Sequence, residues 1–236
     1  MAASTPTTMT EDYLKVIWKS HEWSDEGITT NEIAATLGVA ASSVSGNLNK
    51  LARDGYILHE PYGRILLSDA GRSIAVQMVR RHRIIETYLV EQCGYGWDEV
   101  HEEAEVLEHA VSDRLLEIWD DELGNPLQDP HGDPIPRKDG TVARPDGRRL
   151  HELAEHETGT VLRVSDHDPA LLRYLHSLGI TVGSTLTVHA RRDYAGSMAV
   201  SRVDDDATTD AAPAPAYPAP VELATVAANA IWVTAA

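Results

Sequence analysis

The chain has little cysteine, no long apolar run and few basic residues for its length. Its 236 residues include one cysteine, Cys93, which excludes a disulfide within the chain and is interpreted as a small core residue. No apolar run reaches the roughly 18 residues of a membrane span, so neither a transmembrane helix nor a membrane partner is expected. Residues 1–15 have no basic start and no apolar core, so they predict no signal peptide. These absences favour a cytoplasmic location.

The sequence also lacks the common enzyme signatures. His101 and Glu102 begin an H-E pair, but Glu105 stands where the second histidine of a zinc protease motif would be. The nucleophile elbow, the Walker loop and the dinucleotide-binding glycine motif are all missing. We therefore expect a protein that is not an enzyme and that takes no small organic substrate.

Basic residues are outnumbered, and the net charge is −17. Phosphate contacts require Lys and Arg, so this charge argues against extensive nucleic-acid binding. Residues 1–72 nevertheless hold 6 of the 20 basic residues and only 9 of the 37 acidic ones, so the acidity is concentrated after residue 72. A small DNA-facing surface within residues 1–72 is compatible with an acidic remainder.

Residues 28–67 predict a winged helix-turn-helix. Two short helices are expected, one capped by Thr30 and ending at Leu37, and one starting at Ser42 or Ser43 and ending before Gly55. Two apolar runs around residues 61–64 then predict a β-hairpin, or wing. Small polar residues on the second helix fit a major groove, and nearby basic residues reach phosphates. An ordinary helical hairpin is the alternative. The predicted DNA contacts are Ser42, Ser43, Ser45, Asn47, Lys50, Arg53 and Arg64.

The rest of the chain predicts further helices and then strands. A first helix is expected within residues 10–20, a long helix over 71–92, and two more beginning at Asp98 and Ser112. Residues 125–147 are rich in Pro, Gly and Asp and predict a loop. Residues 158–236 predict a small β-barrel of about five strands, with a low-complexity insertion at 207–220. The fold class is therefore mainly α with a small β part.

The stretch HEEAEVLEH, residues 101–109, gathers two histidines and four glutamates. On a continuous helix, His101, Glu105, Glu108 and His109 would share one face, where a divalent metal would offset their charge. A charged, solvated helix surface is the alternative. Other ligand candidates are His82 and Glu86 at helical spacing, Asp12 on the first helix, Asp129 and His131 in the loop, and Asp168 in the β part. Carboxylate and imidazole donors without thiolate suit Mn²⁺ or Fe²⁺.

The order of these features resembles the diphtheria toxin repressor family of metal-dependent transcriptional repressors. The resemblance rests on the winged helix, RRHRIIETYLVEQCGY, WDEVHEEAEVLEHAVSDRLL and DPHGDPIP, and favours the manganese transport regulator branch in its three-domain form. It implies a homodimer that binds operator DNA. It also implies a DNA-binding domain at 1–72, a helical dimerisation and metal-binding domain at 73–140, a linker at 141–157 and an SH3-like, FeoA-like domain at 158–236.

The same resemblance implies two metal sites. The primary site would use Asp12, Glu105, Glu108 and His109. The second would use His82, Glu86, His131 and Asp168, with His101 and Asp129 as further candidates. Hard oxygen ligands at Asp12 and Glu105 favour Mn²⁺, with Fe²⁺ as the alternative cofactor. The chain departs from short two-domain manganese regulators at Lys15, where they carry Glu, so their paired-metal arrangement is not implied.

Overall fold

A computed structural model describes residues 6–23, 27–59, 64–203 and 219–235. The chain forms two compact units. Unit 1 comprises residues 1–85, 105–118 and 135–142, and unit 2 comprises residues 86–104, 119–134 and 143–236. Among the described residues, no helix is long and apolar enough to cross a membrane.

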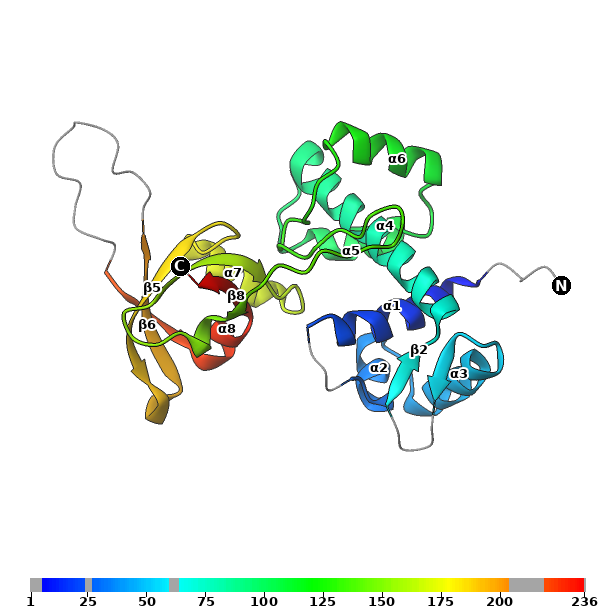
Figure 1. The fold of residues 1–236 in the computed structure, drawn as a ribbon, viewed down its shortest axis with the longest axis horizontal. Coiled ribbons are helices and arrows are strands. Elements are labelled where there is room, and N and C mark those ends of the chain that lie inside the picture. Colours follow the sequence, from blue (N-terminus) through cyan, green and yellow to red (C-terminus); the bar gives the residue numbers. More distant parts are fainter. Residues whose placement is uncertain (1–5, 24–26, 60–63, 204–218, 236) are drawn as a thin grey trace. The chain divides into compact units, whose positions relative to one another are not determined.

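The N-terminal part of unit 1 is the predicted winged helix-turn-helix (Figure 1). It contains α1 (Thr8–Glu22), α2 (Thr30–Thr36), α3 (Ala41–Arg53), β1 (Ile57–His59) and β2 (Ile65–Leu67). The two strands pair antiparallel, and the wing tip between them, residues 60–63, lies outside the described residues. Apolar side chains at helical spacing form one core, including Leu14, Ile17, Ile33, Leu48 and Leu51.

The starts of α2 and α3 differ from the prediction. Thr29, and not Thr30, caps α2: its hydroxyl accepts from the Glu32 backbone N–H at 3.3 Å, and the Glu32 carboxylate accepts from the Thr29 N–H at 2.7 Å. This reciprocal pair is a capping box. Helix α3 begins at Ala41 because Ala40 is extended and serves as its N-cap, although Ala40 has no side chain that could hydrogen-bond.

Replacing Thr29 by Ala removes half of this capping box. We expect Thr29→Ala to lower the free energy of unfolding by about 1 kcal/mol, because one N–H at the start of α2 loses its partner. Urea denaturation of the metal-free protein measures the change, with Thr30→Ala as the matched control on the first helical residue. Equal stability of the two variants would contradict the assignment of the cap.

Three helices follow the winged helix. They are α4 (Asp69–Cys93), α5 (Val100–Leu107) and α6 (Asp113–Glu122). Gly94, with φ +77°, ends α4 as predicted, because glycine adopts the left-handed conformation at little cost. Cys93 is exposed at the end of α4, so its interpretation as a core residue was wrong. The predicted domain boundary at residues 72 and 73 falls inside α4, which runs without interruption into unit 2.

Helix α5 is shorter than the sequence predicted. It ends at Leu107, so Glu108 and His109 lie in the turn that follows it and do not continue its face. His101, at the start of α5, belongs to unit 2, whereas Glu105 and the two residues of the turn belong to unit 1. The predicted single helical face of four ligands therefore does not form: His101 and Glu105 are one turn apart on α5, and Glu108 and His109 lie beyond its end.

The C-terminal part of unit 2 is an antiparallel six-stranded sheet with strand order β3-β8-β4-β5-β6-β7 (Figure 1). Its elements are β3 (Arg148–Arg149), η1 (Leu150–Glu152), β4 (Thr158–Val164), α7 (Pro169–Ser177), β5 (Thr185–Arg192), η2 (Asp193–Ala195), β6 (Ser197–Val203), β7 (Val221–Ala224), α8 (Thr225–Asn229) and β8 (Ile231–Ala235).

The sheet starts earlier than predicted, and it has six strands instead of about five. Residues 148–153, which were predicted to be part of a linker, belong to the sheet domain. Strand β3 pairs with β8, and the fully buried Leu150 and Leu153 pack into the core of the sheet. The predicted loop at 125–147 contains no helix or strand in its described length, only an isolated bridge between Gln128 and Pro134. Of the low-complexity insertion, only residues 219 and 220 are among those described.

Candidate metal centres and DNA interface

The first candidate centre lies in unit 1, between α1 and the turn after α5. Asp12, Glu108 and His109 place ligand atoms within 4.8 Å of one another. His109 Nε2 lies 2.8 Å from Asp12 Oδ1 and 3.4 Å from Glu108 Oε1. Burial raises the pKa of Asp12 above its usual value, although the charges of His109 and Lys15 oppose that shift. The structure thus brings together three of the four residues predicted for the primary site.

Glu11, which the sequence analysis missed, orients the imidazole of this centre. His109 Nδ1 donates a hydrogen bond to Glu11 Oε2 at 3.1 Å, and this bond turns Nε2 towards Asp12. Histidine ligands of metals commonly donate their second N–H to a carboxylate, which fixes both tautomer and ring orientation. The arrangement of His109 therefore fits a metal ligand.

Glu108 is the centre of the polar network in unit 1. It is fully buried, and its two oxygens contact different partners: Oε1 accepts from Lys15 Nζ at 2.5 Å and Oε2 from His82 Nδ1 at 2.6 Å. Glu105, the fourth predicted primary ligand, accepts from Lys15 Nζ at 2.8 Å. His82, Glu105 and Glu108 form a second group of ligand atoms within 4.8 Å of one another. His82, predicted for the second site, thus bonds to the primary one.

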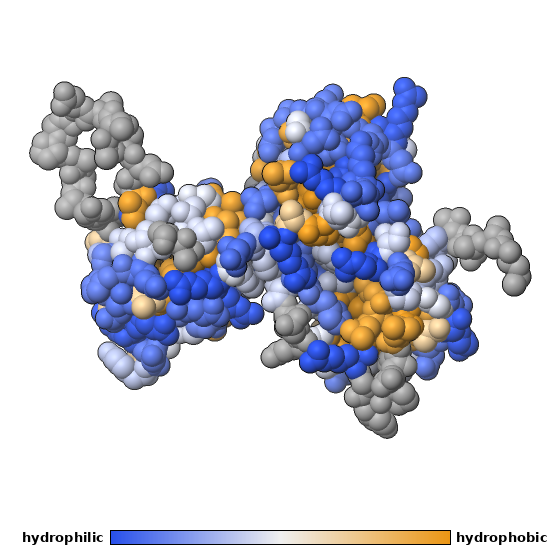
Figure 2. All heavy atoms as spheres, viewed as in Figure 1, coloured by the Kyte–Doolittle hydropathy of each residue, from blue (hydrophilic) through white to orange (hydrophobic). Residues whose placement is uncertain are grey.

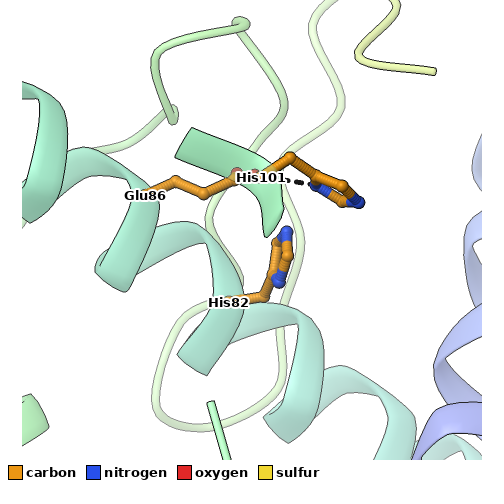
Figure 3. A group of neighbouring side chains, drawn as sticks. All are labelled: His82, Glu86 and His101. Atoms are coloured by element: carbon orange, nitrogen blue, oxygen red, sulfur yellow. Dashed lines mark hydrogen bonds and ion pairs between the residues drawn. The ribbon is translucent and has the colours of Figure 1, made fainter. Parts of the chain in front are cut away.

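The second candidate centre lies in unit 2. Glu86, Asp129 and His131 are all buried and place ligand atoms within 4.8 Å of one another. His101 Nδ1 donates to Glu86 Oε1 at 3.0 Å, and Figure 3 shows this bond with His82 one turn earlier on α4. His101 Nδ1 also lies 3.8 Å from Asp166 Oδ2. His82 also places a ligand atom within 4.8 Å of those of Glu86 and His101 (Figure 3), so five of the six residues predicted or considered for the second site lie close together here.

Asp168 is the predicted second-site residue that the structure places elsewhere. It is exposed, and its carboxylate caps α7 by accepting from the N–H groups of Ala170 and Leu171 at 2.8 and 3.3 Å. Asp166, two residues earlier, is the buried carboxylate beside His101. An aspartate directly before Pro169 is a recognisable helix N-cap, so the sequence contained a signal for the capping role.

His131 shows that unit 2 fits a metal. Its Nε2–H donates to the Trp97 carbonyl at 2.6 Å, and its buried Nδ1 has no hydrogen-bond partner in the part of the chain that the structure describes. Burial would lower the pKa of His131, but the negative charges of Glu86, Asp129 and Asp166 outweigh it and raise the pKa above its usual value. A cation here would give His131 Nδ1 a partner and would offset the negative charge of the three carboxylates.

The loop that carries His131 is held by its own backbone and by the sheet. Asp129 Oδ1 accepts from the N–H groups of His131 and Asp133, each at 2.9 Å. Gly132 has φ +88°, and a Cβ there would lie 1.9 Å from the Leu162 carbonyl oxygen on β4. Only glycine allows this close approach, so the loop is fixed against the sheet.

The predicted DNA-contacting residues are mostly exposed, on α3 and directly before β2. The side chains of Ser42, Ser43, Ser45, Lys50, Arg53 and Arg64 all reach the surface. Asn47 differs, because it is half-buried and donates to the Tyr13 hydroxyl at 3.0 Å. Its amide therefore connects α3 to α1, and the other polar residues of α3 remain available for contact.

Comparison with known proteins agrees with this order of parts. Residues 6–65 match the model of the iron-dependent repressor N-terminal DNA-binding domain, and residues 68–137 match the metal-binding and dimerisation domain of the same repressors. Residues 148–207 match the FeoA domain. The iron-dependent repressor IdeR of Mycobacterium leprae is 32% identical over 197 residues, covering 76% of this chain and 83% of that protein.

The chain belongs to the diphtheria toxin repressor family. It is therefore a metal-dependent transcriptional repressor, with an N-terminal DNA-binding domain, a helical dimerisation domain and a C-terminal SH3-like FeoA domain, as predicted. The diphtheria toxin repressor of Corynebacterium jeikeium is 28% identical, covering 78% of this chain and 86% of that protein.

Solved structures of this family are also similar. A manganese-dependent transcriptional repressor in complex with manganese has a TM-score of 0.87 and 48% identity, covering 96% of this chain and all of the other. The manganese regulator SloR has a TM-score of 0.76 and 30% identity, covering 98% of this chain and all of the other.

Proposed function

We propose that this repressor responds to manganese(II), and that the ion is held by Asp12, Glu108 and His109 in unit 1. The observation that carries the proposal is the donor set itself. Two carboxylates and one imidazole, with no sulfur donor among them, gather at one place, and such ligands suit Mn²⁺ better than softer ions. The similar repressor that is 48% identical is manganese-dependent by its description, which supports this choice.

The ligands join the DNA-binding helices to the helical domain. Asp12 lies on α1, which packs in one core with α2 and α3, whereas Glu108 and His109 come from the turn after α5. A bound divalent cation supplies the charge that offsets the carboxylates. Asp12 and His109 then hold α1 against the end of α5, and α3 keeps one orientation relative to the helical domain. Binding of DNA and of metal must therefore strengthen each other equally.

The active form is proposed to be a homodimer on operator DNA in the cytoplasm. Val106, Leu115 and Ile118 are exposed apolar residues of the helical domain, with 68% of Val106 accessible. Figure 2 shows hydrophobic residues among hydrophilic ones over α4 and α5. An apolar face of this kind supports pairing of two copies. Two α3 helices would then meet DNA about 34 Å, or a multiple of it, apart.

The centre in unit 2 is proposed as a second metal site. Glu86, His101, Asp129 and His131 would provide its ligands, with Asp166 replacing the predicted Asp168. His82 lies one turn before Glu86 on α4 and places a ligand atom within 4.8 Å of those of Glu86 and His101, while its Nδ1 bonds to Glu108.

Iron(II) is the competing activator, because the IdeR relatives are iron-dependent by description. The test is binding of the purified protein to promoter fragments of its own genome at fixed salt, with Mn²⁺, with reduced Fe²⁺ and with a chelator. We expect specific fragments to be captured at lower Mn²⁺ than Fe²⁺ concentration, and none with chelator. A lower requirement for Fe²⁺ would make it an iron-responsive repressor, and capture independent of metal would refute a metal-dependent function.

A further inference from the structure

Unit 1 contains two overlapping groups of ligand atoms. Asp12, Glu108 and His109 form one group, and His82, Glu105 and Glu108 form the other. Both groups include the buried Glu108. Its Oε1 lies near His109 of the first group, and its Oε2 bonds to His82 of the second. By geometry alone, this arrangement offers two neighbouring places for cations that share one bridging carboxylate.

The ammonium of Lys15 lies at one of these two places. Its Nζ is 2.8 Å from Glu105 Oε1 and 2.5 Å from Glu108 Oε1, so it bonds to both carboxylates of the second group. Only 3% of Lys15 is exposed, and lysine is almost never buried unless it is paired. Lys15 follows Asp12 by three residues on α1, so the same helix face supplies one ligand and one fixed cation.

We propose that the Lys15 ammonium is a built-in cation that permanently fills the place formed by His82, Glu105 and Glu108. The primary centre then accepts one divalent ion, at Asp12, Glu108 and His109, and Lys15 excludes a second. This assignment rests on the proposed metal-dependent function and specifies how many ions its primary site takes.

The charges support a single ion. The carboxylates of the two groups, Asp12, Glu105 and Glu108, carry three negative charges, which match one ammonium and one divalent ion; Glu11 contacts only the far nitrogen of His109 and belongs to neither group. A second divalent ion beside Lys15 would meet an uncompensated like charge in a buried site, where screening by water is weak. An ammonium also has no lone pair, so it occupies space at the carboxylates without serving as a bridge between ions.

Lys15 also explains how the buried carboxylates are tolerated before the metal binds. Glu108 is fully buried, and a buried charge is costly unless a partner compensates it. Lys15 and His82 supply these partners in the metal-free chain. The centre is therefore held together without metal, with only the place beside Asp12 and His109 left for an ion.

The test counts manganese ions per chain by equilibrium dialysis and elemental analysis. The variants are Lys15→Glu, which adds a ligand, and Lys15→Met, which keeps the stem and removes the charge. Lys138→Met is the matched control, because it removes an exposed ion pair with Glu117 in the same unit. The centre in unit 2 contributes equally to all of these proteins.

We expect Lys15→Glu to bind one ion more per chain than the native protein, and Lys138→Met to bind the same number. In chelator, Lys15→Met should melt on the order of 10 °C below the native protein, because two carboxylates lose their buried partner. Saturating Mn²⁺ should raise the melting temperature of Lys15→Met most of the way back to the native value. A second Mn²⁺ ion should then bind, with lower affinity, at the place that the ammonium occupied.

An unchanged ion count in both Lys15 variants would overturn the proposal whatever their melting temperatures, because Lys15 would then be only a structural partner. If Lys15→Glu does not fold, Lys15→Met alone provides both measurements. These counts require no DNA. A native protein that binds metal but captures no promoter fragment would refute the repressor function while leaving the Lys15 assignment open to the same count.

Discussion

Asp12→Asn is expected to abolish the metal response of DNA binding while leaving the chain folded. The substitution preserves size but removes the charge and half of the ligand capacity at the only primary ligand contributed by α1. Loss of an outer partner of a metal ligand already costs about 10- to 100-fold in affinity, so loss of a ligand should cost at least about 100-fold. Titration of operator DNA at increasing Mn²⁺ measures the effect.

The control for this experiment is Asp146→Asn, which neutralises an exposed aspartate elsewhere in the chain. Its Mn²⁺ requirement should match that of the native protein. Circular dichroism should show equal helix content in all three proteins. An Asp12→Asn protein that still needs the native concentration of Mn²⁺ would rule out Asp12 as a ligand.

Glu22→Gln is expected to cause the largest loss of stability. Arg83 donates to both oxygens of Glu22, at 2.9 and 2.6 Å, and both side chains are buried. The guanidinium also lies 5.6 Å from the centre of the Trp18 ring. Removing one partner leaves a buried charge without compensation, which costs about 3–5 kcal/mol. Urea denaturation in chelator, where metal binding adds nothing, measures the loss.

Two further variants distinguish a buried charge from a general effect of mutation. The double variant Glu22→Met, Arg83→Met should recover much of the lost stability, because it removes both charges and keeps apolar volume. Asp54→Asn breaks an exposed pair with Lys50 and should change stability by less than about 1 kcal/mol. A Glu22→Gln loss as small as that of Asp54→Asn would show that Arg83 finds water or another acceptor.

The order of helices and strands could be predicted because local signals specify it. Gly94, Ser112 and the alternating runs after residue 158 mark boundaries that the structure reproduces within a few residues. The end of α5 at Leu107 could not be predicted from HEEAEVLEH, because its helical periodicity continues past the true end. The turn there is required by the contacts of Glu108, and those contacts involve α1 and α4, far away in sequence.

The same reason explains why the contacts of Glu11 and Lys15 were not predicted. Glu11 contacts His109, 98 positions away, and Lys15 contacts Glu105 and Glu108, 90 and 93 positions away; no spacing pattern within α1 indicates such partners. Asp12 was a ligand candidate from its place on the first helix, but its assignment to the primary site came from the family resemblance. For Asp166, the choice between two nearby aspartates depended on recognising that Asp168 caps α7.

The uninterrupted helix α4 places a strict limit on how this sequence can change. His82, which contacts Glu108 in unit 1, and Glu86, which belongs to the centre in unit 2, are separated by one helical turn, about 6 Å along the axis. Inserting or deleting one residue between them would rotate one centre about 100° relative to the other. The length of α4 between these two positions is therefore fixed, so related chains with both centres should show no gaps there.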